Sequence, residues 1–329
     1  MTPIRIGMIG CGGMARQHGH AWHNVADAEI AALVDPSETN LAQFITEVFA
    51  DKQPPPTFAD HRAMLAETKL DAVLIVSPHA HHFAQAMDAL DAGCHVLIEK
   101  PMVIATAHAK ALIERAETTG RVLSVAFPGP FSPEFQYIRT LIAAGDLGDI
   151  HLVQGTCAQP WIKHVGNTWR AVQALSGGGN LYDSGAHMFN AMLFLTGLSA
   201  EQVFAFVDNK GYDVDIVGSV AIKLTGGALG SAVVSGDAAV FEQGIYIQGT
   251  KGAVKCSIYG GDLQVWLGDK RVESPQLPHT TSLHQNFIDC ISGRATTPSP
   301  ASLGLRQARL MDAIYESART GLAVKVIAD

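Results

Sequence analysis

Apolar residues in the first third of the chain fall into short, nearly continuous runs. These runs cover residues 4–10, 28–35, 70–77, 95–99 and 121–127, and helical patterns separate them near residues 14–26, 38–50, 59–67, 80–92 and 105–119. Nearly continuous apolar strands are typical of a parallel sheet that is covered on both faces. The alternation predicts a doubly wound α/β fold, a Rossmann domain with a parallel sheet, over residues 1–126.

After Phe127 the pattern changes to strands that follow one another directly. They are predicted at 150–158, 203–207, 214–224, 228–235, 243–249 and 262–267, with glycine turns such as "TGGALG" and "GTKG" between them. Such a succession indicates an open, mainly antiparallel sheet, so residues 127–329 are predicted to form an α+β domain for substrate binding and oligomerisation. A last amphipathic helix, near 301–320, ends at Gly321 and is expected to pack near the first domain.

Composition narrows the class of protein. With 329 residues, 47% of them hydrophobic and 16% charged, the chain is an ordinary globular protein with room for two domains. A net charge of -8 without a basic run argues against nucleic acid as a partner. Apolar runs stay well short of the ~20 residues that span a membrane. Five scattered cysteines and an N-terminus without a signal-peptide pattern predict a cytoplasmic protein.

The glycines after the first predicted strand form a binding motif. The sequence "GCGGMA", from Gly10 to Ala15, matches G-x-G-x-x-G/A and lies between a strand and a helix. Gly10 permits a tight turn, and Gly12 lets the backbone approach a pyrophosphate at the helix N-terminus. Gly13 and Met14 are expected at the same place. The motif predicts a dinucleotide cofactor.

Asp35, at the end of the second predicted strand, bears on which dinucleotide is bound. Its carboxylate can accept hydrogen bonds from the adenosine ribose hydroxyls and would repel a 2′-phosphate. No arginine follows it directly, although Arg16 or Arg62 could reach a phosphate from elsewhere in the chain. NAD is therefore favoured over NADP.

Other cofactor contacts are expected beyond the carboxyl ends of the third and fourth core strands, where open α/β sheets bind ligands. Lys100 is of special interest there, because the following proline fixes the backbone. The alternative is a solvated loop lysine that pairs with Glu99. The expected cofactor-lining residues are Ser77, Pro78, His79, His82, Glu99, Lys100 and Pro101.

A run of three glycines leads into an apolar helical pattern that carries Asp183 and His187. Residues four apart on a helix are neighbours, and Asn190 continues the same stripe. A carboxylate and an imidazole among apolar residues are costly to bury unless they are paired or used. The stripe is either a structural pair at a helix start or part of a functional site.

Together these motifs resemble the Gfo/Idh/MocA oxidoreductases, which are named for glucose-fructose oxidoreductase, inositol dehydrogenase and a rhizopine-catabolism protein. The resemblance rests on "GCGGMA", "EKP" at 99–101, "GGGNLYDSGAHMFN" at 177–190, "GTKG" and "ESARTG". It implies a Rossmann domain followed by an open-faced sheet domain. It also implies an NAD-dependent dehydrogenase that acts on a secondary hydroxyl or ketone of a sugar, cyclitol or related polyol, with Lys100, Asp183 and His187 as the catalytic set.

The chemistry gives each of these three residues a role. Oxidation of an alcohol needs a base within hydrogen-bond reach of the hydroxyl while hydride passes to the nicotinamide. His187 is the first candidate, because the usual pKa of histidine is about 6.5 and that of lysine about 10.4. Lys100 would then stabilise the developing alkoxide, and Asp183 would orient the substrate or raise the basicity of His187. The roles of Lys100 and His187 could be exchanged.

Two departures from the family pattern concern residues already named. His79 stands where many members have asparagine, with His82 at the position of the usual later histidine, and Asn190 replaces a common acid. The many histidines raise the question of a metal site, but they lack cysteine or acidic partners at ligand spacing. No metal is expected, and His82 is interpreted as a cofactor or substrate contact.

An irregular stretch before the glycines supplies candidate substrate contacts, since tryptophan and arginine suit sugar faces and carboxylates. These residues are Lys163, His164, Trp169 and Arg170, with Asn190 as a further candidate. The alternative is a loop packed on the sheet edge or a subunit contact.

Two other functions stay open at the level of sequence. One is a non-catalytic dinucleotide-binding regulator, and the other is an NAD-dependent glycoside hydrolase or epimerase that recycles its cofactor. An open sheet face also predicts a homodimer or homotetramer through the C-terminal sheet.

Overall fold

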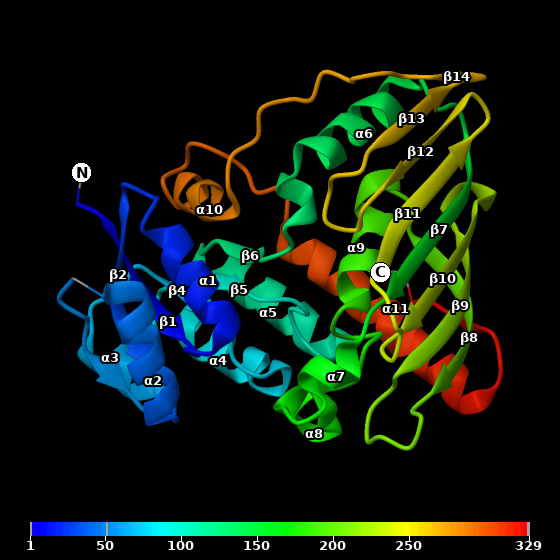
Figure 1. Ribbon diagram of the computed structural model, residues 1–329. Coiled ribbons are helices and arrows are strands. Elements are labelled where there is room, and N and C mark those ends of the chain that lie inside the picture. Colours follow the sequence, from blue (N-terminus) through cyan, green and yellow to red (C-terminus); the bar gives the residue numbers. More distant parts are fainter. Residues whose placement is uncertain (1, 51, 328–329) are drawn as a thin grey trace. The chain divides into compact units, whose positions relative to one another are not determined.

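A computed structural model describes residues 2–50 and 52–327, and the chain divides into two compact units (Figure 1). Each unit contains segments that are distant in sequence. The first unit comprises Met1–Val103, Ala107–Ala126 and Thr281–Gly304, and the second comprises Ile104–Thr106, Phe127–Thr280 and Leu305–Asp329.

The first unit is built on a six-stranded parallel sheet with the strand order β3-β2-β1-β4-β5-β6. This confirms the predicted doubly wound sheet. The short strand β3 forms one edge of this sheet. The strands are β1 (Ile4–Ile9), β2 (Ala28–Val34), β3 (Thr57–Phe58), β4 (Ala72–Ile75), β5 (His95–Ile98) and β6 (Leu123–Val125), and the helices between them are α1 (Gly13–Trp22), α2 (Glu38–Phe44), α3 (His61–Glu67), α4 (His79–Asp91) and α5 (Thr106–Thr119).

A helix from late in the chain completes the core of the first unit. Phe287 and Ile288 of α10 (Leu283–Ile291) are buried in the same cluster as Leu33 and Leu74 of the parallel sheet. Burial of these apolar side chains holds α10 on the Rossmann core. Residues 281–304 therefore belong to the first unit, which corrects the prediction of a continuous second domain over 127–329.

The second unit contains a nine-stranded sheet with the order β14-β13-β12-β11-β7-β10-β9-β8-β15. Neighbouring strands are antiparallel, except that β10 runs parallel to β7. The predicted, mainly antiparallel sheet is confirmed. Its strands are β7 (Ile150–Ala158), β8 (Ala200–Asp208), β9 (Val217–Leu224), β10 (Leu229–Ser235), β11 (Glu242–Gly249), β12 (Gly252–Cys256), β13 (Gln264–Leu267), β14 (Lys270–Arg271) and β15 (Val324–Lys325).

Helices pack on one face of this sheet (Figure 1). They include α6 (Pro133–Ala144), α9 (Gly185–Thr196) and most of α11 (Ala301–Thr320). A Cβ atom on Gly155 of β7 would lie 2.7 Å from Met188 of α9, so this helix and strand are in close contact. Strand β9 alternates buried and outward-facing residues, as expected for a sheet with one covered face.

The last helix, α11, is divided between the two units. Its first residues, Ala301–Gly304, lie in the first unit, but the rest belongs to the second. The hydroxyl of Ser317 accepts a hydrogen bond from the Ala205 N–H of β8 at 3.0 Å. Most of α11 therefore packs on the second unit's sheet. Among the helices of residues 2–50 and 52–327, none is both long and apolar enough to cross a membrane.

Candidate active site

The glycine loop after β1 fits the phosphates of a dinucleotide. Gly10 has a φ of 96°, and a Cβ atom there would lie 2.8 Å from the Val76 carbonyl group, so only glycine is accommodated. Gly12 caps α1, and a Cβ atom on it would meet nothing within 4 Å. The open space lies at a helix N-terminus, whose first N–H groups can bind an anion. Gly13 begins α1, and Met14 in its first turn is exposed.

Asp35 lies directly beside this loop and is almost fully buried. Its carboxylate accepts hydrogen bonds from the backbone N–H groups of Cys11 and Ser37, both at 2.9 Å, and from the Asn40 side chain at 3.2 Å. Asp35 therefore also ties the glycine loop to the end of β2. These donors fix the Asp35 carboxylate in place beside the glycine loop.

Glu99 and Lys100, at the end of β5, are held by a chain of buried polar groups. One Glu99 carboxylate oxygen accepts the Lys100 backbone N–H at 2.9 Å, and the other lies 2.8 Å from Nε2 of His18. Nδ1 of His18 lies in turn 2.8 Å from Nε2 of His284 in α10. Glu99 is therefore a buried carboxylate that these groups hold in place, not the solvent-exposed partner of a surface ion pair with Lys100.

Burial and neighbouring charges set the protonation of this chain. Burial alone would raise the pKa of Glu99, but the His18 hydrogen bond, together with the charges of His18 and Lys100, lowers it to about 2. Burial, together with His18, lowers the pKa of His284 to about 3. Glu99 is thus ionised and His284 is neutral near neutral pH.

His82 has a different role from the predicted one. It is fully buried in α4, and its two ring nitrogens each lie 2.9 Å from a carbonyl oxygen, of Ser77 and of Pro101. Both polar atoms of the ring therefore link the ends of β4 and β5, which contradicts a direct cofactor contact. His79 is also buried, 5.7 Å from His82 between ring centroids, at the start of α4 just after Pro78.

The three glycines of the second unit serve close packing. A Cβ atom on Gly178 would collide with the Tyr315 hydroxyl, and one on Gly179 with the Asp215 carbonyl oxygen. The Asp215 carboxylate accepts hydrogen bonds from the N–H groups of Gly179 (2.6 Å) and Leu181 (2.7 Å) and from the Tyr315 hydroxyl (2.6 Å). Burial raises the pKa of Asp215 despite these donors. These three hydrogen bonds to Asp215, called the Asp215 clamp below, were not predicted from sequence.

Asp183 lies in the turn that precedes α9, which begins at Gly185. The prediction that Asp183 and His187 stack on one helix face is therefore wrong, because the clamped glycine segment bends the chain into a turn first. The Asp183 carboxylate is buried and accepts the Trp161 indole N–H at 2.8 Å, and Nε of Arg170 lies 3.2 Å from the same oxygen. The acid is thus held by two side chains.

The structure brings only part of the predicted substrate stretch to Asp183. Arg170 pairs with Asp183, and its guanidinium lies 4.4 Å above the Trp169 ring. Lys163 and His164 are exposed residues of α7 (Trp161–Val165). Trp161, which sequence reasoning missed, supplies the indole.

His187 lies in the first turn of α9, next to two aromatic rings. Its ring is 4.7 Å from that of Tyr259 and 6.4 Å from that of Phe127, both in edge-on geometry. Tyr259 was not predicted, because a single tyrosine before two glycines carries no spacing signal. Asn190, one turn further along α9, is only 4% exposed, which does not favour a substrate contact.

Within the part of the chain that the structure describes, no group of three or more His, Cys, Asp or Glu side chains is arranged to hold a metal ion.

Comparison with known proteins gives these features a family. Residues 4–127 match the model of an oxidoreductase family with an NAD-binding Rossmann fold, and residues 135–255 match the GFO/IDH/MocA C-terminal domain. The chain belongs to the Gfo/Idh/MocA oxidoreductase family. Both expectations of the sequence, the family and its NAD-binding domain, are confirmed.

Individual relatives in this family are distant. The chain is 31% identical over 204 residues to D-glucoside 3-dehydrogenase of Escherichia coli strain K12, covering 60% of this chain and 56% of that protein. It is 32% identical over 200 residues to the rhizopine catabolism protein MocA of Rhizobium meliloti, covering 60% and 58%. The matched region therefore spans little more than half the length of these relatives.

A solved Gfo/Idh/MocA-like structure shares the whole fold. The WlbA dehydrogenase from Bordetella pertussis, solved in complex with NADH and UDP-GlcNAcA, superposes with a TM-score of 0.85 at 25% identity. The match covers 99% of this chain and 100% of that chain. The order of elements is therefore that of a known dehydrogenase.

Proposed function

We propose that this member of the family is an NAD-dependent dehydrogenase that acts on a secondary hydroxyl, or the matching ketone, of a sugar, cyclitol or related polyol. The observation that carries the proposal is the buried Asp183, held by Trp161 and Arg170 just before the helix that bears His187. A buried acid near a half-buried imidazole is an arrangement that can transfer protons. The substrate class is supported by the name of D-glucoside 3-dehydrogenase and by the UDP-GlcNAcA bound in the WlbA dehydrogenase structure.

Each residue has a definite part in the proposed reaction. The bound nicotinamide supplies the hydride acceptor. His187 accepts the hydroxyl proton, and Asp183 orients the substrate hydroxyl or raises the basicity of the imidazole. Lys100, in the first unit, stabilises the negative charge that develops on the oxygen. If Lys100 and His187 exchange these roles, the base would be the ammonium group's conjugate amine.

Asp35 is the residue proposed to favour NAD over NADP. Its negative charge stands beside the glycine loop and would repel a 2′-phosphate. The loop supplies Gly10, Gly12 and Gly13 for the pyrophosphate, and Glu99 and Pro101 flank the proposed catalytic lysine.

The test uses purified protein freed of bound nucleotide. Formation of reduced nicotinamide is followed by absorbance with NAD, then NADP, across inositols, aldoses, glucosides and sugar acids. We expect NADH to accumulate with one substrate class and to be lost in His187→Ala and Lys100→Ala. Bound NAD without accumulation would overturn the proposal in favour of recycled-cofactor chemistry or a regulator.

A second copy of this chain is the proposed partner of the open sheet face. Large apolar side chains stand exposed on that sheet: Phe206 is 69% exposed, Leu229 56% and Val233 46%. Large apolar side chains exposed on an uncovered sheet face fit an interaction surface. We infer that the protein is a homodimer, or a homotetramer built from such dimers.

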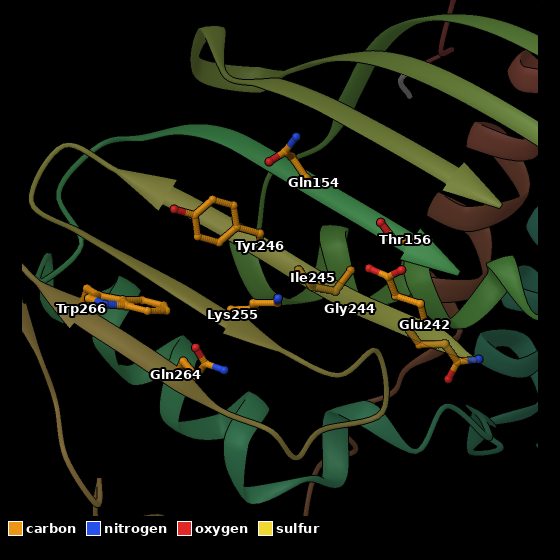
Figure 2. A pocket seen from close by; sticks show the side chains of 10 residues that line it. Gln154, Thr156, Glu242, Gly244, Ile245, Tyr246, Lys255, Gln264 and Trp266 are labelled. Carbon is orange, nitrogen blue, oxygen red and sulfur yellow. The ribbon is translucent and has the colours of Figure 1, made fainter. Parts of the chain in front are cut away.

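A hollow of about 560 Å³ lies on the same face, and Figure 2 shows the side chains that line it. Gln154, Tyr246, Lys255 and Gln264 are paired neighbours that form one row across β7, β11, β12 and β13. Glu242 lines the hollow as well. In a two-fold symmetric contact the same patch meets itself, so the acid of one copy can approach the lysine of the other.

Light scattering after size-exclusion chromatography tests this assembly. We expect Phe206→Glu to shift the protein to monomers, while Phe241→Glu, outside the strands, keeps the wild-type mass. A monomeric wild-type protein would contradict the assignment. A cytoplasmic location is also proposed, because the five cysteines are thiols rather than disulfides, which fits a reducing compartment.

A further inference from the structure

A tyrosine from a loop contacts the proposed base. Tyr259 lies between β12 and β13, and its ring meets the His187 ring at 4.7 Å between centroids with an interplanar angle of 60°. Phe127, the other aromatic neighbour of His187, is 1% exposed, whereas Tyr259 is 38% exposed. The imidazole thus has one buried aromatic neighbour and one that solutes can reach.

The loop that carries Tyr259 is held in place. The Ser257 hydroxyl accepts the Tyr259 backbone N–H at 3.3 Å, and the Ser257 N–H donates to the Gly261 carbonyl at 3.0 Å. Gly260 has a φ of 92°, and a Cβ atom on it would lie 2.6 Å from Ser132 at the start of α6. A glycine that packs this closely against a neighbouring element fixes the path of the loop.

The phenol group of Tyr259 remains a hydrogen-bond donor. Burial raises the pKa of the Tyr259 hydroxyl, and the nearby Cys157 and Asp183 raise it further. The group therefore keeps its proton over the range in which a histidine base works. A phenol donor can bind a sugar oxygen, whereas the apolar edge of the ring covers carbon.

We propose that Tyr259 is a substrate-contacting residue that donates a hydrogen bond to a hydroxyl next to the one being oxidised, while its ring borders the His187 imidazole. This rests on the proposed dehydrogenase function and narrows its substrate. The enzyme takes a polyol with hydroxyls on adjacent carbons, because a single isolated alcohol leaves the phenol donor without a partner.

Steady-state kinetics of Tyr259→Phe tests this role, since the variant removes only the hydroxyl. The probe is whichever of myo-inositol and methyl D-glucoside the wild-type enzyme oxidises faster. We expect KM for the polyol to rise about five- to tenfold, with kcat within about twofold and KM for NAD unchanged. Tyr212→Phe, a half-exposed tyrosine in another loop of the same unit, is the matched control and should behave as wild type.

Removal of the whole ring gives a second readout. In Tyr259→Ala the ring next to His187 is lost, so we expect kcat to fall and the acidic limb of the kcat–pH profile to shift. A merely structural loop residue would lower the amount of folded enzyme without moving that limb. If Tyr259→Ala does not fold, Tyr259→Phe alone decides.

The outcomes separate the two proposals. If wild type oxidises a polyol and Tyr259→Phe has the same KM, the role of Tyr259 is wrong and the dehydrogenase stands. An equal rise in KM for NAD would also overturn it. If wild type oxidises neither these probes nor the wider panel, the dehydrogenase proposal fails and the role of Tyr259 fails with it.

Discussion

Two buried aspartates of the second unit are held in opposite ways. Asp215 accepts hydrogen bonds from the backbone of Gly179 and Leu181 and from the Tyr315 hydroxyl. Asp183 is held by side chains, the Trp161 indole and the Arg170 guanidinium. Backbone donors fix the course of the chain, whereas side-chain donors fix only the carboxylate. We therefore interpret Asp215 as scaffold and Asp183 as part of the reaction site.

The largest effect on stability is expected from Asp215→Ala. The change leaves two backbone N–H groups and a buried hydroxyl without their acceptor, so the free energy of unfolding should fall by about 3–5 kcal/mol. Urea unfolding followed by circular dichroism measures the change. Asp208→Ala, an exposed acid of the same unit, should stay within about 0.5 kcal/mol. If an Asp215 variant is as stable as wild type, the structural role assigned to Asp215 is wrong.

The largest effect on activity is expected from His187→Gln. Loss of the base should lower kcat by about 10²–10⁴-fold and abolish the acidic limb of the kcat–pH profile. The unfolding midpoint should change little, because His187 is only partly buried at the start of its helix. If that limb persists and instead disappears in Lys100→Ala, the roles of lysine and histidine are exchanged.

Glu99 extends the comparison to the first unit and predicts an effect of pH on stability. A lowering of its pKa from 4.5 to about 2 corresponds to about 3 kcal/mol, which is present above pH 4.5 and lost as the pH falls to about 2. His284, with a pKa lowered from 6.5 to about 3, adds a loss of stability as the pH falls below 6.5. Urea titrations of wild type and Glu99→Gln should therefore differ at pH 7 and converge near pH 2. A constant difference would contradict the assigned ionisation.

A smaller effect is expected at Asp35. Asp35→Asn leaves one acceptor oxygen for Cys11 or Ser37 and removes the charge that repels a 2′-phosphate, so relative use of NADP should rise about tenfold. The ratio of kcat/KM values for the two cofactors measures this. Glu38→Gln, an exposed neighbouring acid, is the control. An unchanged ratio in Asp35→Asn would place cofactor selection elsewhere.

The sequence predicts what local pattern determines. Apolar runs and the motif from Gly10 to Ala15 identify both sheets and the cofactor loop, because period and turn chemistry act over a few residues. The helical period misplaces Asp183, because it takes no account of the Asp215 clamp. In that clamp Asp215 binds Gly179, which lies 36 residues earlier in the chain.

Long-range contacts explain the other differences. His284 meets His18 across 266 residues of sequence, and Tyr315 meets Asp215 across 100. Tyr259 reaches His187 from a separate strand connection. No spacing rule links such residues before the chain is folded, so α10, the clamp and the tyrosine emerge only from the structure.

The central claim is that Asp183 serves the reaction and Asp215 serves the fold. The most direct test measures NADH formation per folded enzyme, together with the thermal midpoint, for Asp183→Asn and Asp215→Asn with the best substrate of the panel. We predict that Asp183→Asn keeps its midpoint and loses at least about 10²-fold in kcat, while Asp215→Asn melts earlier and turns over normally where folded. Full activity in Asp183→Asn would contradict the account.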